Sequence, residues 1–286
     1  MMGSSESYAT TKTLAVTADN GVDYAYRDTG QDSDVPPLVL LQHFRGNLDN
    51  WDPALVDALA QDRRVIAFDN AGVGSTTGRT PHSIAEMAQD ALDFFDALGL
   101  ARIDLLGFSI GSFVAQEIAL RRPDPVERIV LASAAPQGAS GMHGWAPDII
   151  EAVGGRETSP EGYLRVFFTS TDAGLRAGQL AAQRIFGERT EGRDEPTSWA
   201  TRLAQYDAVT SWGVPNHALL ERVTAIQQPV FVANGDSDRM ILPRYSYLLA
   251  GLLPDATVKI YPDAAHGFLF QHHEEFAADV NAFLRR

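Results

Sequence analysis

The pattern of apolar and polar residues along this chain of 286 residues predicts strands and helices in alternation. Two short alternating runs, TLAVTA and VDYAYRD, flank Asn20-Gly21, a dipeptide typical of hairpin turns. The continuous apolar run PPLVLLQ, residues 36–42, is typical of a strand buried on both faces of a parallel sheet. Further strands are predicted at RRVIAFD, ARIDLL and VERIVLAS, with helical stretches between them. This alternation indicates βαβ units and a mostly parallel sheet covered on both faces by helices.

The helix predicted after residue 82 has the clearest boundaries. Ser83 and Glu86 have the spacing of a capping box. Apolar residues then recur at helical spacing as far as Leu98, and Gly99 is expected to end the helix.

The alternation of strand and helix stops at about Ala135. From 136 to 220 the chain has helical pieces punctuated by Gly and Pro, and no strand pattern. Strand character returns at QPVFVANG and ATVKIYP, and EEFAADVNAFLRR is a predicted final helix. We therefore expect one α/β core, residues 1–135 and 221–286, interrupted by a helical insertion, residues 136–220, called the insertion segment below.

A serine with a glycine two residues away on each side lies between a predicted strand and a predicted helix. The motif is Gly107-Phe108-Ser109-Ile110-Gly111. A serine on such a sharp turn stands clear of the backbone, and its neighbours must be small because strand and helix crowd each other there. The following helix N-terminus adds N–H donors and a positive dipole end. Ser109 is therefore a candidate nucleophile, although a chance motif in a turn has the same letters.

A serine hydroxyl needs a base and a group that orients the base, and the expected chain order is Ser, acid, His. Asp236 and Asp238 follow the strand QPVFVANG, and His266 follows the strand ATVKIYP. His43 ends a strand at the same edge of the sheet, and it is the only serious rival to His266.

These motifs resemble those of the α/β-hydrolase superfamily, in its esterase and cofactor-free haloperoxidase-like branch, from about residue 12 onwards. The superfamily pattern G-x-x-D, followed shortly by proline, favours Asp238 over Asp236, because Gly235 precedes and Pro243 follows. A histidine followed by glycine matches His266-Gly267. The resemblance implies an α/β-hydrolase fold, a Ser109–His266–Asp238 triad and an insertion segment that serves as a helical cap.

The oxyanion donors that the resemblance implies are the N–H of Ile110 and an N–H from the loop after LVLLQ. That loop departs from the superfamily pattern, because Phe44 stands where glycine usually follows the histidine. The second donor is Phe44 or Arg45, and we favour Phe44. Arg45 is a candidate for holding a substrate carboxylate, or it is solvated or ion-paired.

Composition narrows the range of partners. The formal net charge of −14 argues against nucleic acid or an anionic membrane surface as a partner. There is no cysteine, and we find no motif for a metal or a phosphate-bearing cofactor; Gly72 and Gly74 begin no dinucleotide fingerprint, because position 77 is threonine. The first residues lack the pattern of a secretory signal and no apolar run is long enough to span a membrane, so we expect a cytoplasmic protein. The sequence leaves the oligomeric state open.

The leading hypothesis is a serine hydrolase without cofactor or metal, acting on a carboxylic ester or lactone of a small, largely apolar molecule. Perhydrolysis, with peroxide replacing water, would use the same triad, and a slowly turning-over, receptor-like ligand-binding member of the fold is the alternative from another class. We expect the substrate site to involve five residues of the loop after LVLLQ and the insertion segment: His43, Arg45, Trp145, Phe168 and Trp212.

Overall fold

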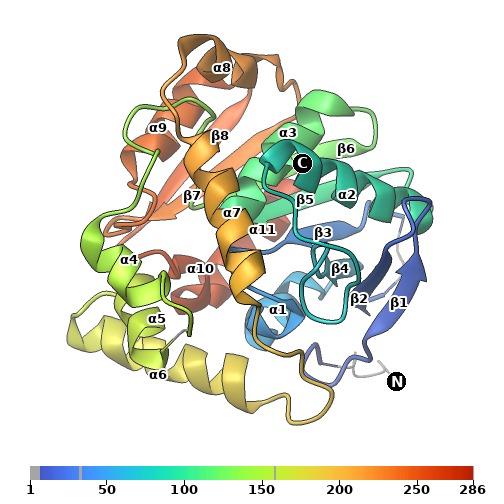
Figure 1. Ribbon diagram of the computed structural model, residues 1–286, viewed down its shortest axis with the longest axis horizontal. Coiled ribbons are helices and arrows are strands. Elements are labelled where there is room, and N and C mark those ends of the chain that lie inside the picture. The colour runs from blue at the N-terminus through green and yellow to red at the C-terminus, as the bar shows by residue number, and fades with distance from the viewer. Residues whose placement is uncertain (1–6, 32–33, 158, 286) are drawn as a thin grey trace.

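The central feature of the structure is an eight-stranded sheet (Figure 1). The computed structural model describes residues 7–31, 34–157 and 159–285. The strand order is β1-β2-β4-β3-β5-β6-β7-β8; β2 is antiparallel to β1 and β4, and all other neighbours are parallel. The strands are β1 Leu14–Thr17, β2 Asp23–Thr29, β3 Leu38–Leu41, β4 Val65–Phe68, β5 Ile103–Phe108, β6 Val126–Ala132, β7 Val230–Gly235 and β8 Ala256–Tyr261. The predicted mostly parallel α/β fold is confirmed.

Helices cover the sheet, so that every residue of β3, β4, β5 and β7 is buried. In the core, α2 packs on α3 and α1 packs on α11. The core helices are η1 Leu48–Asn50, α1 Pro53–Leu59, α2 Ile84–Ala97, α3 Ile110–Arg121, η2 Arg222–Ala225, α9 Arg244–Leu252, α10 Phe268–Gln271 and α11 His273–Leu284. Within the part of the chain that the model describes, no helix combines the length and apolar character that a membrane span requires.

Local signals in the sequence predicted several boundaries well. The hairpin turns at Asn20-Gly21, where Gly21 has a φ of +79°. Ser83 Oγ accepts a hydrogen bond from Glu86 N at 3.2 Å and begins α2. The second half of the expected capping box differs, because the Glu86 carboxylate accepts from the Ser83 hydroxyl and not from its N–H. Gly99, with a φ of +65°, follows the end of α2 as predicted.

The insertion segment lies between β6 and β7 and carries the helices α4 Pro147–Val153, α5 Pro160–Phe167, α6 Asp172–Gly187, α7 Trp199–Trp212 and α8 His217–Glu221. No strand occurs in its described residues. Figure 1 shows α4, α5 and α6 gathered at one end of the molecule, while α7 passes in front of the sheet in this view. One firm attachment to the core is the ion pair between Arg184 of α6 and the fully buried Asp52 before α1, with Nη2 and Oδ2 2.6 Å apart.

Candidate active site

Ser109 occupies the sharp turn between β5 and α3 in a strained conformation. Its φ of +56° and ψ of −121° are unusual for a residue with a side chain. Neighbouring structure holds this conformation, because Ser109 N donates to Ala132 O of β6 at 2.9 Å and Ser109 O accepts from Ser112 N at 2.8 Å. Such strain, about 1–3 kcal/mol per residue, persists where the surroundings over-determine it, often at functional sites.

The two flanking glycines are required by close approach of the backbone. A Cβ on Gly107 would lie 2.3 Å from Gly111 O, and one on Gly111 would lie 2.1 Å from Leu41 O. The steric reason that the sequence suggested for this spacing is therefore confirmed. The second contact also shows that the end of β3 lies directly against the start of α3, beside Ser109.

His266 is paired with Asp238 in the buried region at the ends of β7 and β8. His266 Nδ1 lies 2.8 Å from Asp238 Oδ2, and the histidine is only 1 % exposed. Asp238 Oδ1 accepts from Met240 N at 2.8 Å and Ile241 N at 3.0 Å, which fixes the carboxylate. The carboxylate facing Nδ1 favours the neutral tautomer that has its proton on Nδ1 and its lone pair on Nε2.

Asp236, the other candidate acid, has a different task. Its Oδ2 accepts from Asp263 N at 3.0 Å and its Oδ1 from Ala264 N at 3.3 Å, so it holds the loop that leads to His266. Asp263 itself has a φ of +48° and accepts from the hydroxyl of Thr169 at 2.8 Å. The hydroxyl groups of Thr171 and Thr169, which both donate to this carboxylate, lower the pKa of Asp263. Asp263 thus shapes the turn that precedes His266.

The backbone N–H groups of the loop after β3 can be accounted for one by one. Each N–H from residue 43 to residue 50 donates to an acceptor, with the exception of Phe44, which finds none among the described residues. The acceptors in chain order are Gln42 Oε1, Gln205 Oε1, His43 O, Asn50 Oδ1, Asp69 Oδ1, Asn47 Oδ1 and Asn47 O. Ile110 is the first residue of α3, so its N–H has no acceptor within the helix. Among the described residues, Phe44 and Ile110 thus both have an N–H without an acceptor.

His43 lies close to His266, and the two rings contact the same two phenylalanines. The ring centroid of Phe167 is 5.3 Å from each histidine, and that of Phe108 is 5.2 Å from His43 and 5.1 Å from His266. Burial, with a smaller effect of nearby His266, lowers the pKa of His43 to about 4. His43 Nδ1 contacts Phe44 O at 2.9 Å, and the side chain has no carboxylate partner among the described residues. His43 is therefore a neutral imidazole and a poorer candidate base than His266.

Arg45 contacts the insertion segment through its whole length. Its guanidinium donates to Gly155 O at 2.6 Å and Arg156 O at 2.9 Å, in the loop that follows α4. Its N–H donates to Gln205 Oε1 at 2.7 Å. Arg45 thus joins the loop after β3 to the insertion segment. Its half-buried side chain lines the cavity described next, and it has no ion pair among the described residues.

A cavity of about 490 Å³ reaches the buried site at His43, Phe44 and His266. Ser109 is 3 % exposed and is not part of the cavity surface. The wall contributed by the insertion segment includes three aromatic side chains in contact. Tyr163 stacks on Phe167 with the ring centroids 4.0 Å apart, and Phe186 meets Tyr163 edge to face at 5.6 Å.

Three residues expected at the substrate site lie elsewhere, because none of them lines this cavity. Trp145 packs between Phe44 and Tyr206. Phe168 is buried where α5 meets Gly178 of α6, and Trp212 stacks on Phe113 of α3. Their size and apolar character reflect packing of the insertion segment on itself and on the core. Other aromatic residues of the insertion segment, Tyr163, Phe167 and Phe186, line the cavity.

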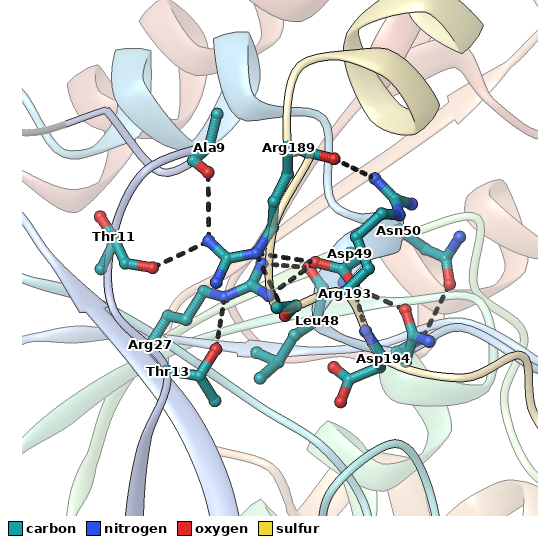
Figure 2. Close-up of polar contacts among 12 residues, drawn as sticks. Ala9, Thr11, Thr13, Arg27, Leu48, Asp49, Asn50, Arg189, Arg193 and Asp194 are labelled. Carbon is teal, nitrogen blue, oxygen red and sulfur yellow. Dashed lines mark hydrogen bonds and ion pairs between the residues drawn. The ribbon is translucent and has the colours of Figure 1, made fainter.

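Part of the cavity wall belongs to the segment after α6, residues 193–197, and a cluster of charged side chains fastens this segment to the core (Figure 2). Arg27 of β2 and Arg189 both contact Asp49, with nitrogen–oxygen distances of 2.6 Å and 3.6 Å. Asp194, whose N–H donates to Asp49 Oδ2 at 2.7 Å, lines the cavity.

Asp69, at the end of β4, adds a third carboxylate to this cluster. A Cβ on Gly74 would lie 2.3 Å from Asp69 Oδ2 and 3.0 Å from Asp194 Oδ1, so the two carboxylates share one small space. The Oδ2 atoms of both aspartates lack a donor among the described residues. Burial, and then the nearby carboxylate of Asp194, raise the pKa of Asp69 well above its ordinary value. Asp69 is therefore a carboxyl group that retains its proton to higher pH than usual.

Comparison with known proteins agrees with this architecture. The family model of the alpha/beta hydrolase fold matches residues 36–273. A solved structure of an alpha/beta hydrolase fold protein from Chitinophaga pinensis is 40 % identical, with a TM-score of 0.91, and the match covers 98 % of this chain and 99 % of that one. The chain belongs to the α/β-hydrolase fold family.

Two curated relatives have named activities. A poly(3-hydroxyalkanoate) depolymerase of Ectopseudomonas oleovorans is 30 % identical over 87 % of this chain and 84 % of the relative. A non-heme chloroperoxidase of Streptomyces lividans is 27 % identical over 94 % of this chain and 99 % of the relative. Hydrolases and a peroxidase of this fold are thus similar to the chain, in agreement with the branch expected from the sequence.

Proposed function

We propose that this protein is a serine hydrolase that cleaves a carboxylic ester or lactone through an acyl-enzyme. The observation that carries the proposal is the hydrogen bond between His266 Nδ1 and Asp238 Oδ2, because it leaves the lone pair of Nε2 available to take a proton. Ser109, strained on its turn with its backbone fixed, is the nucleophile. Asp238, buried beside the ring, stabilises the imidazolium that forms.

In the first half of the reaction Ser109 Oγ bonds to the carbonyl carbon, and its proton passes to His266 Nε2. The carbonyl oxygen becomes an oxyanion that accepts hydrogen bonds from the free N–H groups of Phe44 and Ile110. Collapse of this intermediate breaks the bond to the leaving oxygen, which takes the proton from His266 and leaves as an alcohol. Water then attacks the acyl-enzyme with His266 as base, and the acid is released.

The cavity supports a small, largely apolar substrate. Its volume of about 490 Å³ lies within the range usual for small-molecule sites. Phe44, Tyr163, Phe167 and Phe186 supply its aromatic surface. The insertion segment contributes three of these four side chains, so in this proposal it is a cap that determines specificity. The depolymerase relative, whose named polymer is joined by ester bonds, supports ester chemistry.

The test is labelling by a fluorophosphonate probe together with hydrolysis of a panel of aryl esters, alkyl esters and lactones. We expect the wild-type protein to be labelled and to hydrolyse apolar esters better than highly charged ones, and Ser109→Ala to do neither. Absence of labelling in the wild type would favour a receptor-like ligand-binding protein. Hydrolysis by correctly folded Ser109→Ala would exclude the proposed nucleophile.

The relative named as a non-heme chloroperoxidase supports a second candidate, perhydrolysis at the same site. Here hydrogen peroxide replaces water at the acyl-enzyme, and a peracid replaces the carboxylic acid as the product. Addition of peroxide to the esterase assay distinguishes the two, because a perhydrolase converts part of the acyl group to peracid. If only acid is formed at high peroxide, hydrolysis is the sole activity.

A further inference from the structure

One wall of the cavity is formed by a segment without helix or strand. This wall segment, residues 193–197, lies between α6 and α7, and all five of its residues line the cavity. Its hydrogen bonds to the core include one from Asp194 N to Asp49 Oδ2 at 2.7 Å and one from Asn47 Nδ2 to Glu195 O at 3.3 Å. The position of this wall therefore depends on single polar contacts and not on regular secondary structure.

The carboxyl groups of Asp194 and Asp69 meet beside Gly74, in one small space. Ser75 Oγ donates to Asp194 Oδ1 at 2.7 Å, and Leu48 N donates to Asp69 Oδ1 at 2.8 Å. The two remaining oxygens, both Oδ2, are buried and have no donor among the described residues. A single proton held between the two carboxyl groups supplies a hydrogen bond that joins them. Without that proton, both groups are acceptors only, and nothing joins them.

The charges around this pair balance only when it holds a proton. The other charged or titratable groups that face it are Asp49, Arg27, Arg189 and Tyr8 (Figure 2). Burial raises the pKa of the Tyr8 hydroxyl, which is therefore neutral. Both arginines contact Asp49, and neither forms an ion pair with Asp69 or Asp194 among the described residues. With one proton on the pair, two arginines face two carboxylates, and without it they face three.

Loss of this proton places two negative charges in a buried space. Burial, and then the charge of Asp194, raise the pKa of Asp69 well above its ordinary value, so the pair holds its proton to higher pH than usual. Once the proton has left, the two carboxylates repel each other with little screening by solvent or salt. Asp69 is 1 % exposed and directly follows β4, whereas Asp194 is half-buried in the irregular wall segment. The wall segment is therefore the part that moves.

We propose that the Asp69–Asp194 pair is a proton-dependent contact that holds the wall segment against the core, so that the cavity opens on this side when the pair loses its proton. Because the docked state binds one more proton than the released state, a rise in pH favours release. A released wall segment no longer contacts a substrate in the cavity, so KM rises with pH. This effect on KM rests on the proposed serine-hydrolase function, but the movement of the wall segment does not.

The first test is hydrogen–deuterium exchange of the peptide that spans the wall segment, measured without substrate. The Asp194 N–H donates to Asp49 in the docked state, so its protection reports docking. The proteins compared are wild type, Asp69→Asn and Asp194→Asn, because an amide in either position is a permanent donor in place of the shared proton. Asp124→Asn, at an exposed aspartate without an ion-pair partner among the described residues, is the matched control.

We expect protection of the wall segment, corrected for the intrinsic exchange rate, to fall about tenfold or more from pH 5 to pH 9 in wild type and in Asp124→Asn. In Asp69→Asn and Asp194→Asn it should change less than about threefold, because neither variant brings two carboxylates together. Equal protection of the wild type at both pH values would overturn the proposal. A full response in either asparagine variant would overturn it as well, since the pair would not be the group that titrates.

The second test asks whether the movement reaches a substrate. For one aryl ester, the ratio of KM in wild type to KM in Asp69→Asn should rise at least threefold between pH 6 and pH 9. Effects of pH on the catalytic residues are common to both proteins and cancel in this ratio. A constant ratio would overturn the proposed control of the cavity, even if exchange depends on pH. If neither protein hydrolyses any ester, the hydrolase proposal fails, and the exchange measurement still decides whether the pair holds the wall segment.

Discussion

His266 Nδ1 lies 2.8 Å from Asp238 Oδ2, and both side chains are almost completely buried. The other oxygen of this carboxylate, Oδ1, accepts from two backbone N–H groups, those of Met240 and Ile241. The pair is therefore held in one orientation before any substrate arrives. The carboxylate of Asp236, two residues earlier, accepts instead from the loop that leads to the histidine and from the hydroxyl of Ser237.

This difference predicts unequal effects for two matched substitutions. Asp238→Asn keeps the shape of the side chain but removes the charge that stabilises the imidazolium, so kcat should fall by about 10⁴. Asp236→Asn keeps an oxygen acceptor for the loop, and kcat should fall less than about tenfold. Initial rates on one aryl ester, with circular dichroism as the check of folding, measure both. If Asp236→Asn loses more activity than Asp238→Asn, the assignment of Asp238 as the acid is wrong.

The strained conformation of Ser109 predicts a trade between stability and activity. Ser109→Ala and Ser109→Gly should both be inactive, but alanine keeps the strain of about 1–3 kcal/mol and glycine relieves it. The greater freedom of glycine in the unfolded chain offsets about 0.4–1 kcal/mol of that gain. Urea unfolding should therefore give Ser109→Gly a free energy of unfolding about 1 kcal/mol higher than that of Ser109→Ala. If Ser109→Gly is instead less stable than Ser109→Ala by about 0.4–1 kcal/mol, the turn carries no strain.

The site elements that could be predicted from the sequence depend on short-range rules. The glycine spacing around Ser109 is a local signal, because Gly107 must approach Gly111 four residues later. Asp238 and His266 were predicted from short motifs of the resembled superfamily that follow two predicted strands. The choice of Phe44 over Arg45 as donor has a different origin. Its physical reason is that Gln205, 160 residues further along the chain, occupies the Arg45 N–H, and no local pattern reports this contact.

Local sequence patterns also do not report which aromatic residues line the cavity. Phe167 and Phe168 are neighbours of equal size and are equally buried, yet Phe167 faces the cavity and Phe168 packs against α6. The difference arises because α5 ends at Phe167, and where its last turn points depends on how the helix docks on the loop of His266. Gly267 N donates to Phe167 O at 2.8 Å in that contact. Tertiary packing of this kind leaves no trace in the spacing of apolar residues.

The paired carboxylates of Asp69 and Asp194 predict a dependence of stability on pH. Because the pKa of Asp69 is raised in the folded protein, the folded state binds a proton that the unfolded chain releases near pH 4. Its contribution to stability is therefore fully present below about pH 4 and is lost as pH rises through the folded pKa. The charges around the pair are those of Asp49, Arg27 and Arg189.

Asp69→Asn should remove this dependence. The asparagine oxygen can still accept from Leu48 N, and its NH₂ group can donate to Asp194, as the protonated carboxyl does. We expect Tm of the variant to exceed that of the wild type at pH 9 and to approach it at pH 5. Asp124→Asn, at an exposed aspartate without an ion-pair partner among the described residues, is the control and should run parallel to wild type. If Tm of Asp69→Asn and Tm of the wild type change in parallel between pH 5 and pH 9, Asp69 is ionised throughout this range.

The contrast between Phe167 and Phe168 gives the sharpest test of the substrate site, because the two residues differ in what they face and in little else. Phe167→Leu removes an aromatic ring from the cavity wall next to His266, so the ratio of kcat/KM for aryl over alkyl esters should fall several-fold. Phe168→Leu removes the same atoms from the packing between α5 and α6. That variant should lower Tm while it keeps the wild-type order of substrates.

The measurement is a profile of kcat/KM over matched aryl and alkyl esters, recorded beside Tm for each variant. If both variants keep the wild-type order, the aromatic wall does not contact the substrate; if Phe168→Leu alone changes it, the substrate binds on the other side of α5.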